Sequence, residues 1–278
     1  MSPLPPLREV IARHGLDARK RLGQHFLLDG NLTDKIARAG GALEGRSVLE
    51  VGPGPGGLTR SLLAAGAQVV AVEMDERCLD ALAELQPVYG DRFRVVHGDA
   101  LAFPLSRAEL PPPISIIANL PYNVATPLLF AWLEQLDQIE QIVVMVQKEV
   151  AQRICATPGS KAYGRLAVML QAACRAEILF HVPAAAFTPP PKVTSSVLAL
   201  RPRAERPDAD MLARLSATAA LAFNQRRKML RSSLGGAVPD LEVHLEALGL
   251  SPTLRPEKLS VPQFLALAER IGDRLRTS

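Results

Sequence analysis

The first 150 residues alternate between short apolar runs and stretches with helical period. Five apolar runs are expected to form strands, at residues 47–51, 68–72, 93–96, 114–118 and 142–146. After the first run, residues 58–65 repeat apolar positions at helical spacing, and Gly66 ends that pattern. Unbroken apolar strands with helices between them predict a parallel sheet that is covered on both faces.

The pattern changes in the second half of the chain. Residues 163–173 are expected to form a helix. Two further strands, at 178–182 and 193–200, flank a proline-rich stretch and would close the sheet. From 210 to 275 the apolar positions recur at helical spacing, which predicts a region without strands.

Length and composition fit two packed domains. The 278 residues are 48% hydrophobic and 22% charged, which excludes a mainly disordered chain. Because single cores stop growing at about 250–300 residues, we predict a first domain at 1–205, with a basic N-terminal extension, and a helical second domain at 206–278. No apolar run approaches the roughly 18 residues of a membrane span. The first residues lack the apolar region of a secretory signal.

Charge, cysteine and histidine content indicate which partners, compartment and metal sites to expect. The formal charge of +4 permits a polyanionic partner without requiring one. Cys78, Cys155 and Cys174 form no CxxC pair, which favours a reducing compartment and a cytoplasmic protein. The five histidines are scattered, so we expect no structural metal.

A glycine-rich loop follows the first strand. Gly52, Gly54 and Gly57 have the spacing of a dinucleotide-binding turn, where glycines let the backbone approach a ligand closely. Glu73 ends the second strand, where a carboxylate can bind a ribose diol. Enzymes that use NAD and enzymes that use S-adenosyl-L-methionine share both features, and a tight turn without a ligand is the third alternative.

Two further acids favour S-adenosyl-L-methionine. Glu50 lies directly before the loop, and Asp99 ends the third strand, where it could accept a hydrogen bond from an adenine amine. This cofactor carries a sulfonium and an ammonium instead of a pyrophosphate, so acids suit it better than they suit NAD. An aspartate after a glycine is by itself also a common turn residue.

The segment Asn119-Leu120-Pro121-Tyr122 follows the fourth strand, at the edge where such sheets bind ligands. An exocyclic amine on a base is a poor nucleophile because its lone pair is delocalised into the ring. The side-chain carbonyl of Asn119 and the backbone at Leu120 could accept its protons, while Pro121 holds the turn. Tyr122 could stack on the base. The alternative is that Asn119 caps a turn and Tyr122 belongs to the core.

Two basic segments are candidates for phosphate contacts. Residues 223–234 contain basic side chains and no acid, and helical spacing would place Arg227, Lys228 and Arg231 on one face. A second cluster is formed by Arg19, Lys20 and Arg21. Both could bind RNA phosphates, although a solvated basic face is the usual role of such runs.

Taken together, these segments resemble the ribosomal RNA adenine N6,N6-dimethyltransferases, the KsgA family. The resemblance runs nearly end to end and includes residues 22–27, 50–54, 119–122, 187–193 and 223–228, with Glu73 and Asp99. It implies a Rossmann-like, class I S-adenosyl-L-methionine methyltransferase domain, with a seven-stranded and mostly parallel sheet, and a small all-α C-terminal domain.

The resemblance also implies roles for individual residues. Family positions that contact the cofactor match His25, Leu27, Gly52, Glu73, Asp99 and Asn119, and Gly54 belongs to the same loop. His25 stands where some relatives have asparagine. Phe187 is similar to the family's second aromatic around the target adenine, opposite Tyr122, although a buried phenylalanine is also common in a core.

The family's implied reaction is dimethylation of N6 of two adjacent adenosines near the 3′ end of 16S rRNA, within the small ribosomal subunit. A monomer with a part in ribosome assembly is expected. Three alternatives stay open: a large-subunit rRNA methyltransferase of the macrolide-resistance type, an RNA-binding assembly factor with weak activity, and an NAD oxidoreductase. The last lacks an evident catalytic constellation at the sheet edge.

Overall fold

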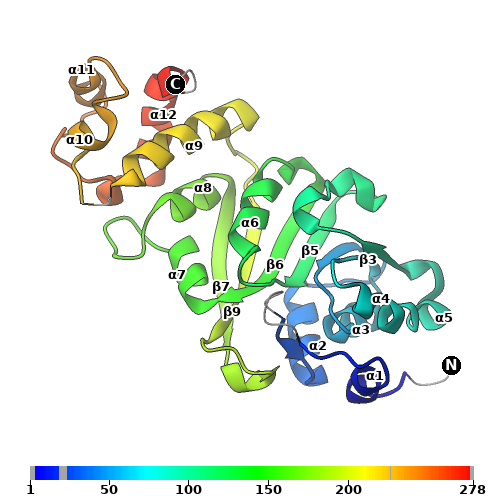
Figure 1. Cartoon of the computed structure of the whole chain (residues 1–278). Helices are drawn as coiled ribbons and strands as arrows, with labels where there is room; N and C mark the ends of the chain where they lie inside the picture. Colours follow the sequence, from blue (N-terminus) through cyan, green and yellow to red (C-terminus); the bar gives the residue numbers. More distant parts are fainter. Residues whose placement is uncertain (1–3, 19–23, 226, 276–278) are drawn as a thin grey trace. The chain divides into compact units, whose positions relative to one another are not determined.

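The chain folds into two compact units (Figure 1). The computed structural model describes residues 4–18, 24–225 and 227–275. The first unit comprises Met1–Ala151 and Glu177–Arg201, and the second comprises Gln152–Ala176 and Pro202–Ser278. The expected split at 205/206 therefore needs a correction, because residues 152–176 join the C-terminal unit. The reason is that α8 (Arg165–Ala173) packs against α9 (Ala209–Asn224) and α12 (Val261–Leu275).

The centre of the first unit is a seven-stranded sheet, as expected. In spatial order the strands are β4 (Phe93–His97), β3 (Gln68–Glu73), β2 (Ser47–Val51), β5 (Ile114–Asn119), β6 (Ile139–Gln147), β9 (Ser195–Pro202) and β7 (Cys174–Val182). The first five are mutually parallel, and β9 runs antiparallel to β6. Every residue of β2 is buried, which confirms that both faces are covered.

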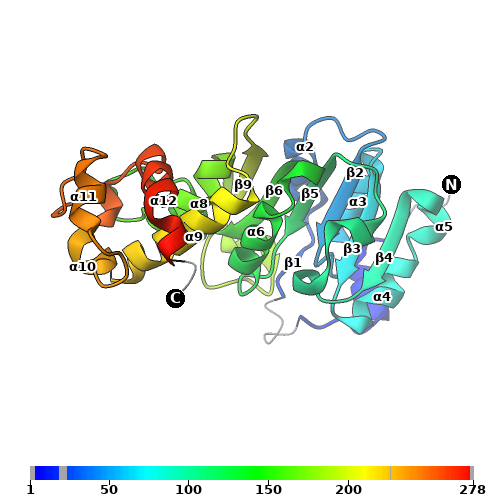
Figure 2. The ribbon, with the colours of Figure 1, turned by 90° about the horizontal axis from the view of Figure 1, so that it is seen from above.

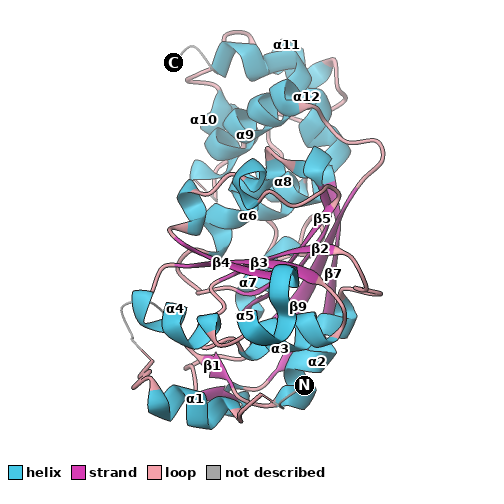
Figure 3. Cartoon of the chain, turned by 90° about the vertical axis from the view of Figure 1, so that its right-hand side faces the viewer, coloured by secondary structure: helices cyan, strands magenta, loops and turns pink. Residues whose placement is uncertain are grey.

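The strand order reverses between β2 and β5. From β2 the chain continues to β3 on one side, and from β5 it continues to β6 on the other side. Because crossover connections are right-handed, this reversal places α3 (Gly57–Ala64) and α6 (Ala125–Leu133) on opposite faces (Figure 3). The loops that follow β2 and β5 then meet at the point where such sheets bind ligands.

Five more helices precede β7 in the described part of the chain, namely α1 (Leu7–Arg13), α2 (Gly30–Ala39), α4 (Glu76–Ala83), α5 (Gln86–Tyr89) and α7 (Lys148–Ile154). Of these, α4 packs against β3 and β4, and α5 packs against β4. One hydrophobic cluster joins Ile36 of α2 and Leu62 of α3 to Val143 of β6. None of the helices in the described parts of the chain is long and apolar enough to cross a membrane.

A second, two-stranded sheet was not predicted. It pairs β1 (Phe26–Leu27), labelled in Figure 2, with β8 (Phe187–Thr188) in antiparallel register, with Leu27 opposite Phe187. Two-residue strands are too short to give a periodic signal, and these two are about 160 positions apart in the chain. The pair nevertheless brings two segments of the family resemblance into contact.

The second unit is helical after Pro202, as expected. Besides α8, α9 and α12 it contains α10 (Leu230–Leu234), α11 (Leu241–Glu246) and a 3-10 turn at Pro256–Lys258. Phe223 at the end of α9 stacks on Phe264 of α12, with ring centroids 5.4 Å apart. Stacked aromatic rings of this kind hold α9 and α12 together.

The single helix expected over 223–234 is interrupted. Helix α9 ends at Asn224 and α10 begins at Leu230, with Met229 in an extended conformation between them. The backbone N–H groups of Leu230 and Arg231 donate to carbonyls of Leu254 and Pro252, so tertiary hydrogen bonds replace the helical ones. The prediction that Arg227, Lys228 and Arg231 lie on one face of a single helix is therefore wrong.

Candidate active site

A pocket of about 250 Å³ opens at the carboxyl ends of β2, β3, β4 and β5 in the first unit. All the predicted cofactor residues line it, namely His25, Leu27, Gly52, Gly54, Glu73, Asp99 and Asn119. Leu120, Pro121 and Tyr122 line the same pocket. The reversal of strand order therefore brings together the glycine loop, the two acids and the Asn119–Tyr122 segment, as the sequence predicts.

The glycine loop packs closely against β1. Gly52 and Gly54 have φ angles of +66° and +55°, a region that favours glycine. A Cβ at Gly54 would lie 3.3 Å from the Phe26 ring, and one at Gly57 would lie 2.6 Å from the Leu27 carbonyl oxygen. These close approaches explain how β1, which precedes the sheet, forms one wall of the pocket.

Glu73 ties the end of β3 to the glycine loop. Its Oε2 accepts the Gly54 N–H at 2.9 Å, and its Oε1 accepts the Asp75 N–H at 2.8 Å. The side chain is buried, and burial raises its pKa above the ordinary value despite these hydrogen bonds. Each carboxylate oxygen has two acceptor sites, so the group can also accept hydrogen bonds from a ribose diol.

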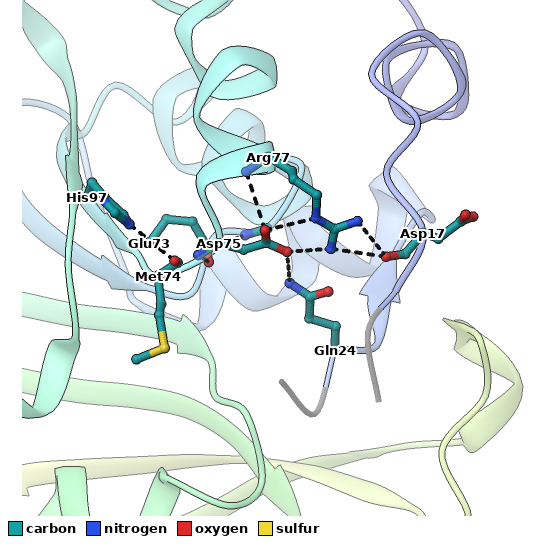
Figure 4. A network of polar contacts seen from close by, with 8 residues as sticks. Asp17, Gln24, Glu73, Met74, Asp75, Arg77 and His97 are labelled. Carbon is teal, nitrogen blue, oxygen red and sulfur yellow. Dashed lines mark hydrogen bonds and ion pairs between the residues drawn. The ribbon is translucent and has the colours of Figure 1, made fainter. Parts of the chain in front are cut away.

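Asp75 and Arg77 form a fork-like ion pair just beyond Glu73 (Figure 4). The Arg77 Nε and Nη2 lie 3.0 and 2.6 Å from the two carboxylate oxygens of Asp75. Gln24 donates to Asp75 Oδ2 at 2.9 Å. The Arg77 guanidinium lowers the pKa of Asp75 to about 2, so this carboxylate is ionised at neutral pH. Sequence reasoning missed this network, because no local pattern signals a contact between residues 24 and 75.

Asp99 is an exposed residue that lines the pocket. Its Oδ1 accepts the Leu101 N–H at 2.9 Å and caps a 3-10 turn at Ala100–Ala102. Met74 and Leu101, which follow the two acids in the chain, line the pocket with 48% and 43% of their surface exposed. Exposed large apolar side chains in a pocket mark a surface for an apolar ligand face. Sequence reasoning also missed these two residues, although their places after Glu73 and Asp99 could have indicated them.

The Asn119–Tyr122 segment is held by the sheet. Asn119 Nδ2 donates to the His25 carbonyl at 3.3 Å, and the Leu120 N–H donates to the Met145 carbonyl at 3.2 Å. The Tyr122 hydroxyl is 2.7 Å from Ser195 Oγ, and its half-buried ring lines the pocket. Leu120 is buried in the core, whereas the Asn119 and Tyr122 side chains line the pocket and are only partly buried.

Phe187 does not face this pocket in the structure. Only 3% of its surface is exposed, and it belongs to the hydrophobic core beside β1. The ring that contacts Tyr122 is instead His25, with centroids 5.7 Å apart, and His25 also meets Phe187 edge-on at 6.3 Å. The expected pair of Phe187 and Tyr122 facing one another needs this correction, because pairing of β1 with β8 turns Phe187 toward the core.

The described residues of the candidate RNA-binding segments do not line this pocket. Arg227, Lys228 and Arg231 are exposed in the second unit, the first two in the turn before α10 and the third within α10. Arg19, Lys20 and Arg21 lie outside the described residues. Within the described part of the chain, no group of three or more metal-ligating side chains could hold a metal ion.

Fold and site together define the class of protein. The mostly parallel seven-stranded sheet with β9 antiparallel to β6, the glycine loop and the acids at the strand ends are those of a Rossmann-like class I methyltransferase. Comparison with known proteins gives the family. Residues 15–273 match the family described as "Ribosomal RNA adenine dimethylase", and the chain belongs to that family.

Similar proteins support this assignment over the full length. The chain is 56% identical to the ribosomal RNA small subunit methyltransferase A of Dinoroseobacter shibae, over 97% of both chains. It is 52% identical to the protein of the same name from Rhodospirillum rubrum, over 96% of this chain and 93% of the relative. Membership of a methyltransferase family rules out the NAD oxidoreductase alternative.

Two solved structures share the fold. A dimethyladenosine transferase from Plasmodium falciparum superimposes with a TM-score of 0.75 at 25% identity, over 90% of this chain and 98% of that one. The 23S rRNA methyltransferase ErmE superimposes with a TM-score of 0.66 at 29% identity, over 90% and 99%. The latter corresponds to the large-subunit alternative.

A buried acid in the pocket gives a test by pH. Glu50 is 1% exposed, and burial, together with the nearby Glu73 carboxylate, raises its pKa to about 8. A raised pKa in the folded state contributes stability that is complete below the ordinary value near 4.5 and is lost as the pH rises through 8. Glutamine is neutral at every pH and has nearly the same shape.

We therefore expect Glu50→Gln to raise the melting temperature of the cofactor-free protein by about 2–4 °C or more at pH 8. At pH 4.5 the gain should be close to zero, and calorimetry at the two pH values measures the difference. Glu242→Gln, at an exposed position of α11, is the control and should leave the melting temperature unchanged. A Glu50→Gln gain that is equal at both pH values would contradict the buried-acid interpretation.

Proposed function

We propose that the protein transfers methyl groups from S-adenosyl-L-methionine to N6 of two adjacent adenosines near the 3′ end of 16S rRNA, within the small ribosomal subunit. The observation that carries this proposal is the meeting of the Asn119–Tyr122 segment with the glycine loop and acids in one pocket. The relatives named for the small subunit support the choice of substrate. A part in subunit assembly, as a monomer in the cytoplasm, completes the proposal.

The pocket residues fit this cofactor. Glu73 would bind the ribose diol, Asp99 the adenine amine, and Met74 with Leu101 the faces of the adenine ring. Glu50 Oε2 is buried without a hydrogen-bond partner among the described residues, which suits a ligand with positive groups. His25, Leu27, Gly52 and Gly54 would form the walls through their backbone. When bound, the cofactor supplies an electrophilic methyl group.

The protein's part in the reaction is positioning. Asn119 Oδ1 and the backbone at Leu120 would accept the two protons of the adenine amine and hold the nitrogen in a more tetrahedral geometry. Tyr122 would stack on the base, a contact worth about 1–3 kcal/mol, and its bond to Ser195 fixes the ring. No separate general base is needed, because orientation and electrostatics favour attack by the nitrogen lone pair.

A second candidate function rests on the similarity to ErmE, which is a large-subunit methyltransferase by name. The deciding experiment incubates the protein with labelled S-adenosyl-L-methionine and unmodified small subunits, naked small-subunit rRNA, naked large-subunit rRNA or DNA. We expect label in N6,N6-dimethyladenosine from small subunits. Label only from large-subunit rRNA would favour the second candidate, and cofactor binding without transfer would favour an assembly factor.

Replacing Asn119 should separate chemistry from cofactor binding. We expect Asn119→Ala to lower kcat by at least about 10²–10³-fold while the Kd for the cofactor changes little. Glu73→Ala should mainly raise that Kd, which calorimetric titration measures. Asn31→Ala, the same change at an exposed position of α2, is the control and should alter neither quantity. Turnover that survives in Asn119→Ala would overturn the role of the amide as an acceptor.

We also propose that Arg227, Lys228 and Arg231, together with Arg19, Lys20 and Arg21, contact rRNA phosphates. Within the described residues the first three form no ion pair and are exposed, so their charges are available. The double change Arg227→Glu and Arg231→Glu should weaken RNA binding and reduce the slope of log Kd against log salt by about 2. Arg38→Glu with Arg46→Glu, exposed in the first unit, is the matched control. An unchanged slope in the first variant would contradict the proposal.

A further inference from the structure

We propose that Gln24, Asp75 and Arg77 act as positioning residues that set the orientation of the Asn119 amide through the backbone carbonyl of His25. This inference rests on the proposed function, in which Asn119 accepts a proton from the target amine. It assigns a purpose to the ion pair beside the pocket (Figure 4).

The first step is the amide of Asn119. Its Nδ2 donates to the His25 carbonyl at 3.3 Å. In a planar amide the nitrogen and oxygen diverge, so holding Nδ2 against His25 directs Oδ1 away from that carbonyl. Asn119 lines the pocket, where its oxygen can accept a proton. The opposite flip would present N–H groups to the amine, and two donors repel one another.

The second step is the placement of the His25 carbonyl. On its C-terminal side, Phe26 and Leu27 pair with β8, and His25 Nδ1 lies 2.8 Å from the Pro189 carbonyl. On its N-terminal side, the Gln24 side chain donates to Asp75 at 2.9 Å. A carbonyl held from both neighbours keeps its direction, which is what a positioning group requires.

The third step is the rigidity of Asp75. Its side chain is only 4% exposed, and it accepts from Arg77 and Gln24 while capping helix α4. Its backbone N–H donates to Glu73 Oε1 at 2.8 Å. Arg77 in turn donates to the Asp17 carbonyl at 3.3 Å. A charge-assisted, bidentate pair of this kind has a defined geometry, so Gln24 is anchored to a fixed point at the end of β3.

Gln24 also lines the pocket, but its side-chain amide donates to Asp75, and the principal cofactor carboxylate is held by other groups. Glu73 is held by backbone N–H groups of Gly54 and Asp75, which a change in the Gln24 side chain leaves in place. Loss of the Gln24 contact should therefore lower kcat while leaving the cofactor Kd nearly unchanged. A residue that only supported the fold would lower stability or change both quantities.

The test reverses the donor and acceptor. Gln24→Glu places a carboxylate against the ionised Asp75, so we expect kcat to fall by between about 10-fold and 10²-fold. Adding Asp75→Asn to that variant lets the new amide donate to the new carboxylate, and kcat should return to within about threefold of the parent. The cofactor Kd and the melting temperature are measured for every variant. Gln24→Ala, which removes the donor without adding charge, replaces Gln24→Glu if the latter does not fold.

Glu84→Gln is the matched control. It removes the negative charge that Glu84 presents to Arg13 and His14 beside α4, the helix that carries Arg77, and it leaves the Gln24 and Asp75 side chains unchanged. This control should keep the parent kcat. A parent kcat in Gln24→Glu, or a double variant no better than the single one, would overturn the inference. Absence of methyl transfer by the parent protein would instead overturn the proposed function.

A readout independent of activity comes from the Asn119 side-chain N–H signals, assigned in an ¹⁵N spectrum by their loss in Asn119→Ala. The proton bonded to the His25 carbonyl should exchange with water faster in Gln24→Glu than in the parent, and the double variant should restore slow exchange. Equal exchange rates in the parent and in Gln24→Glu would overturn the inference, whatever the activity.

Discussion

The reversal of strand order between β2 and β5 is the constraint on which the site depends. Right-handed crossovers place α3 on one face of the sheet and α6 on the other, and the pocket opens at the carboxyl ends of these two strands. The glycine loop and the Asn119–Tyr122 segment emerge into that gap from opposite sides of the reversal. Residues about seventy positions apart therefore line one pocket, and the strands that carry them are buried on both faces.

The short strand β1 forms one wall of the pocket at the carboxyl edge of the sheet. It approaches the glycine loop so closely that side chains at Gly54 and Gly57 would not fit without movement, and it pairs with β8 on its other edge. The same strand provides Leu27 to the pocket, while the adjoining His25 carbonyl binds Asn119. One small element thus contributes to the wall of the pocket and to the support of Asn119, and its anchoring at Asp75 holds the chain next to the His25 carbonyl.

Sequence analysis predicted the parts of this structure that local patterns encode. The strands of the sheet, the loop at Gly52 and the acids at strand ends all follow from short apolar runs and turn residues. The missed features depend on tertiary contacts. When β1 pairs with β8, the Phe187 side chain lies in the core. Hydrogen bonds to the carbonyls of Pro252 and Leu254 interrupt the expected helix near Arg227. Neither contact leaves a periodic signal, because each joins residues far apart in the chain.

The acids of the pocket explain why a cationic ligand suits this site. Burial raises the pKa values of Glu50 and Glu73, so ionising both in the empty pocket is unfavourable. A ligand that brings positive charge would favour the ionised carboxylates and relieve that cost, whereas a pyrophosphate would add to it. Asp75, whose charge is already compensated by Arg77, does not share this need. Under the proposed function, Glu50 and Glu73 would therefore contact the ligand, whereas Asp75 holds the structure around the pocket.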